Sequence, residues 1–397
     1  MNDVMSFSLD KVRHDTPSCR EVLHFNNAGA SLMPSLAYQA MCHHLSLEQS
    51  IGGYEAAAQS FDKVDSFYTA FADLLNAQPD EIAYVENATR AWDMTVYALP
   101  FQAGDRVLVH EAEYSSNYLA LLQLVQSKGI EIDLVPSDES GQIDCGAIDG
   151  MITPRTKAIF LTHVPSHGGL VNPAEDVGKI VRKHNIIYVL DACQSVGQMP
   201  VDVKAIGCDI LCGTGRKFLR GPRGTGFLYV SKRILNDLHP AFIDLHAAEW
   251  TSTNNYTLRS DAKRFEGWER FVAGQIALGE AARYAMDIGL SVIEERIQFL
   301  ANILRNQLQT IEGVRLHDRG VKKCGIVTFS YEGTAAADIV ERLRAKGINT
   351  SAAKLEHARL DLEKRDISSL VRASVHYYNT EDEVKRFCSA IQHLDLL

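Results

Sequence analysis

The sequence predicts an α/β protein in which helices cover a mainly parallel sheet. Short apolar runs recur between residues 82 and 230, and helical patterns separate many of them. With 397 residues, of which 46% are hydrophobic, the chain is long enough for a large sheet-centred core and a second domain.

The amino-terminal part is expected to be helical and the central part to supply the sheet. Amphipathic patterns predict helices over residues 36–50 and 60–75, the second ending shortly before Pro79. Seven strands are expected after these helices, near residues 82–85, 106–110, 131–135, 158–162, 187–190, 209–212 and 226–230.

The carboxy-terminal part predicts a smaller α+β domain. A long helical stretch is expected over residues 290–310. Strand patterns at residues 324–331 and 370–375 then alternate with helical patterns at 335–345 and 381–394. We therefore expect a large domain over residues 1–290 and a small domain over residues 291–397.

Charge and composition exclude several classes of function. The net charge of −10 gives no electrostatic basis for binding nucleic acid or an anionic membrane. The first 19 residues contain no apolar signal-peptide core, and no apolar stretch approaches membrane-spanning length. A cytoplasmic protein is expected.

The eight cysteines predict buried thiols. They are scattered without a C-x-x-C pair, and Cys208 and Cys212 flank an apolar run with no accompanying histidine pair. Free cysteine packs as a small hydrophobe. We expect no disulfide and no metal site.

Residues 187–230 carry the clearest chemical signal. Asp191 stands where one expected strand leaves the sheet, the usual place for ligand contacts in an open α/β sheet. Lys217 follows the next expected strand within a few residues. An acid and a lysine at neighbouring strand ends suit a cofactor with a basic ring nitrogen on one side and an aldehyde on the other, which is pyridoxal 5′-phosphate (PLP).

The chemistry of PLP asks for these residue types. A buried carboxylate, here Asp191, keeps the pyridine nitrogen protonated so that the ring withdraws electrons. A lysine that loses its proton readily, here Lys217, holds the aldehyde as a Schiff base, and the charges of Arg216 and Arg220 are expected to lower its pKa and to balance a phosphate. Taken alone, Asp191 could be an ordinary aspartate at a strand end and Lys217 an ordinary surface lysine in a loop. Only the two residues together, in this order along the chain, favour a PLP site.

A phosphate site is expected at the start of a helix. Asn87, Ala88 and Thr89 follow the first expected strand and precede a helical run, so backbone amides and the threonine hydroxyl can meet an anion there. A helix cap without a ligand is the alternative.

The chain also resembles a known family. DACQSVGQMPVDV and CDILCGTGRKFLRGPRGTGFLYV look like the central signature of class V aminotransferase-family PLP enzymes, which include cysteine desulfurases, isopenicillin N epimerase-like proteins and C–S lyases. HFNNAGASLMP, ENATRAWD, THVPSHGGLVNP, KRFEGWE and VRASVHYYNT extend the resemblance over nearly the whole chain. It implies a PLP-dependent transferase of fold type I, with a mainly parallel seven-stranded sheet in the large domain.

The resemblance implies a role for each candidate residue. Tyr114 would stack on the pyridine ring, where desulfurases carry histidine, and Gln194 would bond the phenolic oxygen. Arg216, where desulfurases also carry histidine, would join the phosphate site. The implied cofactor-binding set is Ala88, Thr89, Tyr114, Ser166, Asp191, Gln194, Thr214, Arg216 and Lys217, and the implied substrate-binding set is Asn27, His167 and Arg372.

Arg372 is the candidate for recognising an amino-acid substrate. In VRASVHYYN it matches the family arginine that binds the α-carboxylate, and a guanidinium meets a carboxylate with two parallel hydrogen bonds. An exposed arginine in a salt bridge is the alternative, although apolar neighbours favour a cleft.

The type of reaction depends on a missing cysteine. Desulfurases carry a nucleophilic cysteine upstream of the carboxylate arginine, and residues 348–370 contain none, with Cys324 before and Cys388 after this stretch. Desulfuration by that route is not expected. We expect Lys217 to move the Cα proton and the enzyme to act as a C–S lyase on a sulfur-containing amino acid, with transamination or epimerisation as alternatives.

Two further classes are disfavoured. A dinucleotide-binding dehydrogenase would need a G-x-G-x-x-G turn opening a helix, and GPRGTGF leads into a strand instead. A PLP-fold scaffold without activity would not be expected to retain Asp191, Lys217, Thr89 and Arg372 together.

The resemblance also implies an oligomeric state. The segment KRFEGWE, at residues 263–269, falls where family members send a loop across a dimer interface. We therefore expect a homodimer with shared active sites, in which Trp268 anchors the interface.

Overall fold

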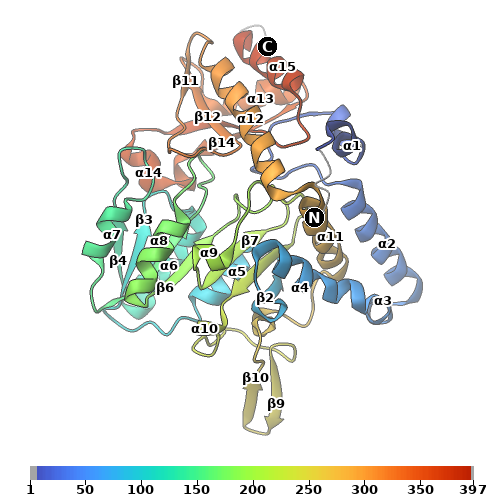
Figure 1. Cartoon of the computed structure of the whole chain (residues 1–397), viewed down its shortest axis with the longest axis vertical. Helices are drawn as coiled ribbons and strands as arrows, with labels where there is room; N and C mark the ends of the chain where they lie inside the picture. The colour runs from blue at the N-terminus through green and yellow to red at the C-terminus, as the bar shows by residue number, and fades with distance from the viewer. Residues whose placement is uncertain (1–6, 395–397) are drawn as a thin grey trace, which may run out of the picture.

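The structure of the chain, a computed structural model, describes residues 7–394 and is built around one seven-stranded sheet (Figure 1). The strand order is β2-β8-β7-β6-β5-β3-β4. Only β8 runs against its two neighbours, and the other strands are mutually parallel, so the predicted mainly parallel sheet is confirmed. The strands are β2 (Ile82–Val85), β3 (Arg106–His110), β4 (Glu131–Val135), β5 (Thr156–Thr162), β6 (Ile187–Asp191), β7 (Ile210–Thr214) and β8 (Gly226–Val230).

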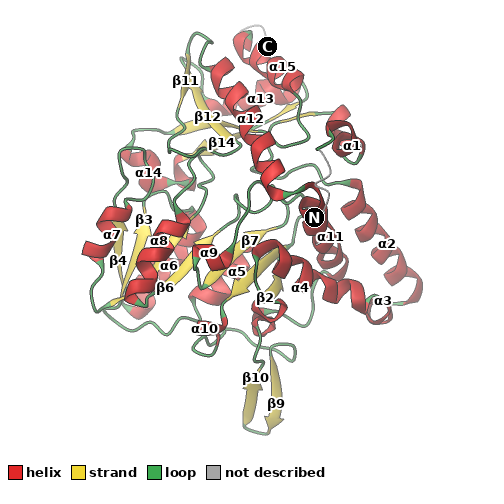
Figure 2. Ribbon diagram, viewed as in Figure 1, coloured by secondary structure: helices red, strands yellow, loops and turns green. Residues whose placement is uncertain are grey.

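The sheet is covered by helices on both faces (Figure 2). Alternate residues of a strand face opposite sides, so Val189 of β6 packs with α5 and α6, whereas Tyr188 and Leu190 face the opposite core with α4 and α8. The helices of this part of the chain are α4 (Phe61–Leu75), α5 (Ala88–Val96), α6 (Ser115–Lys128), α7 (Cys145–Met151), α8 (Ala174–His184), α9 (Val203–Ile206) and α10 (Lys232–Leu235).

A helical layer precedes the sheet in the sequence, as the amphipathic patterns predict. It contains α1 (Leu9–His14), α2 (Ser35–Ile51) and α3 (Gly53–Gln59), and α11 (Val272–Ile288) packs along α2 and α4. None of the described helices is both long enough and apolar enough to cross a membrane.

The carboxy-terminal part forms a second, four-stranded antiparallel sheet, in the order β11-β12-β15-β14. Near the amino terminus, β1 pairs in parallel with β13, so the start of the chain joins this part of the fold. The expected division of the chain into two domains at residue 290 stays a prediction. The elements are β1 (Leu23–His24), β11 (Val314–Leu316), β12 (Ile326–Tyr331), β13 (Ile348–Asn349), β14 (Ser351–Lys354), β15 (Ser369–Ser374), α12 (Leu290–Leu308), α13 (Ala336–Ala345), α14 (Arg359–Lys364) and α15 (Glu381–Gln392).

The predicted helices and strands agree with the observed ones to within two residues at each end. One difference in a strand boundary affects the candidate site. The strand predicted over residues 187–190 includes Asp191, which therefore takes its direction from the strand itself.

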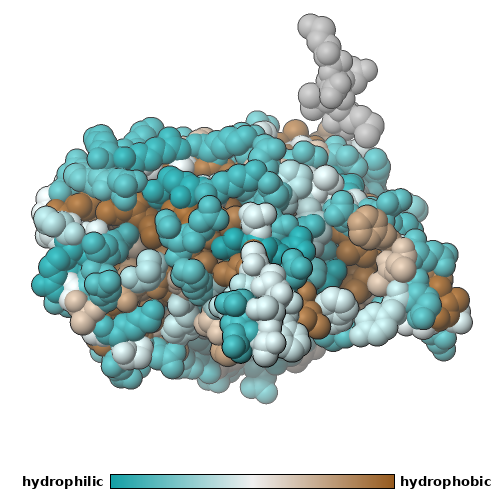
Figure 3. All heavy atoms as spheres, turned by 90° about the horizontal axis from the view of Figure 1, so that it is seen from below, coloured by the Kyte–Doolittle hydropathy of each residue, from teal (hydrophilic) through white to brown (hydrophobic). Residues whose placement is uncertain are grey.

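One projecting element was not predicted. A hairpin of β9 (Ala248–Ser252) and β10 (Asn255–Leu258) extends from the end of the molecule opposite the second sheet (Figure 1). Its side chains are mostly polar and give no alternating apolar signal, yet the cross-strand partners Trp250 and Tyr256 are 71% and 57% exposed. Seen from this end, the surface also carries apolar residues between hydrophilic ones (Figure 3).

Candidate active site

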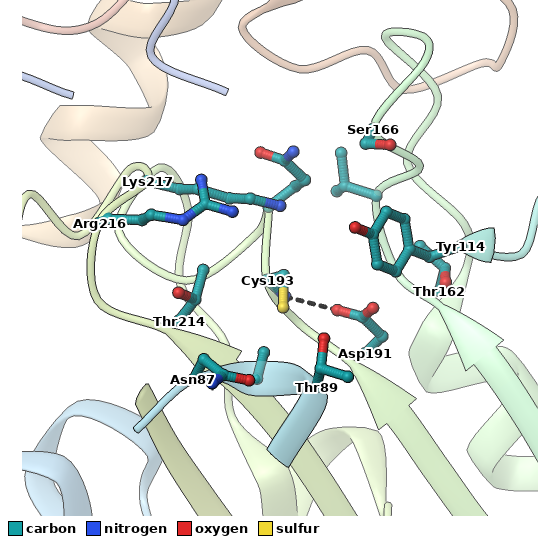
Figure 4. Close-up of a pocket in the computed structure, with 13 residues that line it drawn as sticks. Asn87, Thr89, Tyr114, Thr162, Ser166, Asp191, Cys193, Thr214, Arg216 and Lys217 are labelled. Atoms are coloured by element: carbon teal, nitrogen blue, oxygen red, sulfur yellow. Dashed lines mark hydrogen bonds between the residues drawn. The ribbon is translucent and has the colours of Figure 1, made fainter. Parts of the chain in front are cut away.

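A cavity of about 240 Å³ opens at the carboxyl ends of β5, β6 and β7 (Figure 4). Parallel strands end at one edge of the sheet, so Thr162, Asp191 and Thr214 meet there although they come from three different strands. The lining residues are Asn87, Ala88, Thr89, Tyr114, Thr162, Val164, Ser166, Asp191, Cys193, Gln194, Thr214, Arg216 and Lys217. This set contains every residue of the predicted cofactor-binding set.

Asp191 is fixed by two hydrogen bonds at the base of the cavity. It is 5% exposed, its Oδ1 accepts from the backbone N–H of Cys193 at 2.8 Å, and its Oδ2 accepts from Asn117 Nδ2 at 2.8 Å. Each carboxylate oxygen keeps further acceptor capacity. Asp191 is therefore a buried, oriented acid that can accept a hydrogen bond from a protonated ring nitrogen.

Lys217 enters the cavity from the loop after β7 (Figure 4). It is 9% exposed. Burial lowers the pKa of its ammonium, and the charges of Arg216 and Arg372 act in the same direction, against the opposing effects of Cys193 and Asp191. The lowered pKa makes the neutral amine, which is the nucleophile and the base, easier to reach.

The structure corrects the expectation for Arg220. Its guanidinium does not reach the cavity and donates instead to Tyr377 Oη at 2.6 Å and to the carbonyl of Leu32 at 2.8 Å. It also lies over the ring of Tyr378, 4.7 Å from the centroid. Its backbone adopts a positive φ of 64°, which turns the side chain out of the lysine loop and into the core. Arg220 is a packing residue, not a phosphate contact.

The first turn of α5 supplies backbone donors at another wall of the cavity. Asn87 caps the helix, because its Oδ1 accepts from the N–H of Arg90 at 2.9 Å. The amides of Ala88 and Thr89 have no intrahelical acceptor at this position. With the Thr89 hydroxyl and the positive end of the helix dipole, this turn fits a phosphate group.

Arg372, in β15, does not line the cavity itself and is bonded to the Ser166 loop, which does. Its Nη1 donates to the carbonyl of Ser166 at 2.9 Å and its Nη2 to Asn26 Oδ1 at 3.4 Å. Its Nε is buried and has no hydrogen-bond partner among the described residues. Burial, and then the charge of Arg216, lower the pKa of Arg372 to about 10. Within residues 7–394 no carboxylate pairs with either arginine, so the two cations can bind an anion.

Asn27 and His167 do not line the cavity. Asn27 is fully buried, and its amide donates to the carbonyl of Ser374 at 2.7 Å and accepts from Tyr378 Oη. His167 Nε2 lies 2.9 Å from Asp361 Oδ2. A direct substrate contact from either residue stays a prediction, and both side chains are already bonded elsewhere; Asn26 is the asparagine that faces Arg372.

Three cavity residues were not singled out from the sequence, namely Thr162, Val164 and Cys193, and Asn87 was named only as part of the expected phosphate site. Cys193 had a signal, because it lies two residues after Asp191 in the same turn. Burial, and then the charge of Asp191, raise the pKa of its thiol well above its usual range. Cys193 is therefore a neutral thiol. All eight cysteines of the chain are unpaired.

Comparison with known proteins defines the family. The model of the family "Aminotransferase class-V" matches residues 23–387, so the chain belongs to this family of PLP-dependent enzymes. A probable cysteine desulfurase of Methanothermobacter thermautotrophicus is 28% identical over 97% of this chain and 98% of its own length. The apo structure of a cysteine desulfurase from Thermococcus onnurineus superposes with a TM-score of 0.91, at 28% identity, over 97% of both chains. A structure with glycine covalently linked to its PLP, from a protein named C-DES, shares the fold, with a TM-score of 0.86 at 20% identity over 96% of this chain and 98% of its own.

The residues of the cavity fit PLP, the cofactor of the family. Gln194 lines the cavity, and its buried Oε1 has no hydrogen-bond partner among the described residues, so it can bond a polar group of the cofactor. Three features of the cavity match the three polar groups of PLP. The acid at its base matches the ring nitrogen, the lysine of lowered pKa matches the aldehyde, and the helix start with unpaired amides matches the phosphate.

Proposed function

We propose that this PLP-dependent enzyme is a C–S lyase that eliminates the sulfur substituent of a sulfur-containing amino acid. One observation carries the proposal. The site combines a base, Lys217, with two cations that have no carboxylate partner, Arg216 and Arg372, and the one cysteine that lines the cavity, Cys193, has a raised thiol pKa. Elimination needs the base and the cations and needs no protein thiol.

The roles follow from position and charge. Arg372, helped by Arg216, would bind the α-carboxylate and so fix which bond at Cα lies perpendicular to the cofactor ring. Lys217 would take the Cα proton with its neutral Nζ. Asp191 would hold the ring-nitrogen proton, Tyr114 would cover one face of the ring, and Thr89, Thr214 and the amides of α5 would hold the phosphate. When bound, PLP supplies the electron-withdrawing ring that stabilises negative charge at Cα.

The segment that would carry a desulfurase cysteine is folded and thiol-free. Residues 351–364 form β14, a 3-10 turn and α14, and β15 begins at Ser369. Cys324 and Cys388 are 1% and 6% exposed and pack in the core, outside the lining of the cavity. Cys193 does line it, but its raised pKa keeps the thiol from acting as a thiolate at neutral pH.

Product analysis tests the proposal. Incubated with L-cysteine, the holoenzyme should convert one cysteine and one water into one pyruvate, one ammonia and one hydrogen sulfide, with no alanine. Desulfuration is the second candidate, because the relatives of comparable length are named probable cysteine desulfurases. Alanine as the main product would overturn the lyase proposal, and so would a keto acid formed only with an amino acceptor or a racemised substrate.

We also propose a cytoplasmic homodimer that shares its active sites. Trp268 is 53% exposed and lines a second cavity, of about 650 Å³, with Tyr54 and Phe271. Aromatic residues that are exposed in a single chain and surround one cavity are typical of the centre of a protein interface, where they become buried on association. Light scattering of the holoenzyme should give about twice the chain mass, and Trp268→Ala should raise the dimer dissociation constant by about ten-fold or more. A fully active monomer would contradict the shared site.

A further inference from the structure

A second buried acid, Glu113, lies beside the cofactor-binding residues. It is 3% exposed and directly precedes Tyr114. Its Oε1 accepts from the backbone N–H of Tyr114 at 2.8 Å, from Asn117 Nδ2 at 2.9 Å and from the hydroxyl of Thr162. Its Oε2 is buried with no partner within residues 7–394. One oxygen of Glu113 therefore joins three neighbours of the cavity.

Asn117 connects this acid to Asp191. It is 3% exposed in the first turn of α6, and its Nδ2 donates both to Glu113 Oε1 and, at 2.8 Å, to Asp191 Oδ2. An amide side chain can rotate by half a turn, which exchanges its donor and its acceptor end. The rotated form would point Oδ1 at two carboxyl groups, so Glu113 and Asp191 together select the form that donates.

The bond to Asn117 does not require a charge on Glu113. Burial is the main cause that raises the pKa of Glu113 to about 7, and the charge of Asp191 adds to it against the hydrogen bonds from Thr162 and Asn117. A carboxylic acid and a carboxylate both accept through Oε1. A glutamine at this position would keep an acceptor in the place of Oε1, lose the charge and put an amide NH2 in the place of Oε2.

We propose that Glu113 is a positioning residue for the ring-nitrogen site: it holds the donor end of Asn117 against Asp191 and thereby fixes the carboxylate that faces the cofactor ring. The inference rests on the proposed role of Asp191. Glu113 also anchors the backbone of Tyr114 and the hydroxyl of Thr162, so one side chain sets the base of the cavity and the residue expected to stack on the ring.

The visible absorption spectrum of the holoenzyme and the rate of PLP loss on dilution test this role. Glu113→Gln should keep the wild-type spectrum and lose PLP within about three-fold of the wild-type rate, whereas Glu113→Leu should shift the band and lose PLP about ten-fold faster. Asn117→Ala removes the bridge but leaves the bonds to Tyr114 and Thr162, so it should reproduce the shift if Glu113→Leu does not fold.

Glu111 offers a matched control. It is 6% exposed, two residues earlier, and bonds Lys364 and Ser137 instead of the cavity residues, so Glu111→Gln should leave the spectrum unchanged. A wild-type spectrum in both Glu113→Leu and Asn117→Ala would overturn the inference, and so would Glu113→Gln behaving like Glu113→Leu. A wild-type spectrum in Asp191→Asn would instead overturn the role of Asp191.

Discussion

The two sides of the cavity are built in different ways. The cofactor side, formed by Thr89, Asp191, Thr214 and Lys217, uses the ends of strands and the start of a helix, and each side chain faces the cavity. The proposed substrate side consists of the loop around Ser166, which lines the cavity, and of Arg372 and helix α14, which do not; contacts between distant segments hold it together.

Asp361 is the centre of the substrate side. Its carboxylate accepts from His167 Nε2 at 2.9 Å and from Arg365 Nη1 at 2.9 Å, and it lies 3.4 Å from Arg319 Nη1. His167 and Asp361 are 194 positions apart in the chain. The comparison teaches that the proposed cofactor side is fixed by local chain geometry, whereas the proposed substrate side depends on the contacts that β15 and α14 make with the loop after β5.

Removal of Lys217 should have the largest effect. Lys217→Ala loses both the covalent attachment of PLP and the base, so turnover should fall by about 10³-fold or more. After borohydride treatment, mass spectrometry should find the cofactor mass on the wild-type chain and not on the variant. Lys364→Ala, on the substrate side, is the control, since that exposed lysine makes only an ion pair with Glu111. Normal turnover of Lys217→Ala would remove this residue from the mechanism.

Asp191→Asn should have the next largest effect. The neutral amide no longer holds the ring proton, and loss of one hydrogen bond to a charged group corresponds to about a 10- to 100-fold fall in kcat. The melting temperature of the apo protein should change by only a few degrees. Steady-state kinetics and calorimetry on the same preparation measure kcat and the melting temperature separately. A large fall in the melting temperature would show that Asp191 stabilises the fold instead of serving the cofactor.

Arg372→Lys should affect binding more than chemistry. A lysine keeps the charge but cannot form two parallel hydrogen bonds with a carboxylate, so KM should rise by about ten-fold while kcat changes less. Spectral titration with an accepted amino acid measures the binding directly. An unchanged titration would place the carboxylate elsewhere, and Arg216→Lys would be the next variant to measure.

Asp361→Asn should have the smallest effect on turnover and a clear effect on stability. Burial acts to raise the pKa of Asp361, but the bond from His167 and the charge of Arg365 outweigh burial and hold it well below its usual range. Because the folded-state pKa is depressed, this stability is present above the unfolded pKa of about 4 and is lost as pH falls through the folded value. At pH 7 the variant should lose about 1–3 kcal/mol of unfolding free energy, and the difference from wild type should shrink below pH 4. A pH-independent difference would contradict the ionic role.

The fold was predictable because its signals are local. The seven strands of the large sheet are short apolar runs, and a run of that kind is recognisable without knowing its neighbours. The β9–β10 hairpin was missed because its exposed polar strands carry no such pattern. The turn of Arg220 into the core was missed because a positive φ at a non-glycine residue has no reliable sequence signal.

The sequence by itself determined which residues gather at the proposed cofactor side of this protein. An acid, a lysine and a helix cap placed at the ends of recognisable strands come together wherever a parallel sheet forms, since all such ends lie at one edge. Only the tertiary structure decided that His167 bonds Asp361, that Asn26 and not Asn27 faces Arg372, and that Glu113 reaches Asp191 through Asn117. These contacts depend on side-chain direction and on segments far apart in the chain, and neither is encoded in local sequence periodicity.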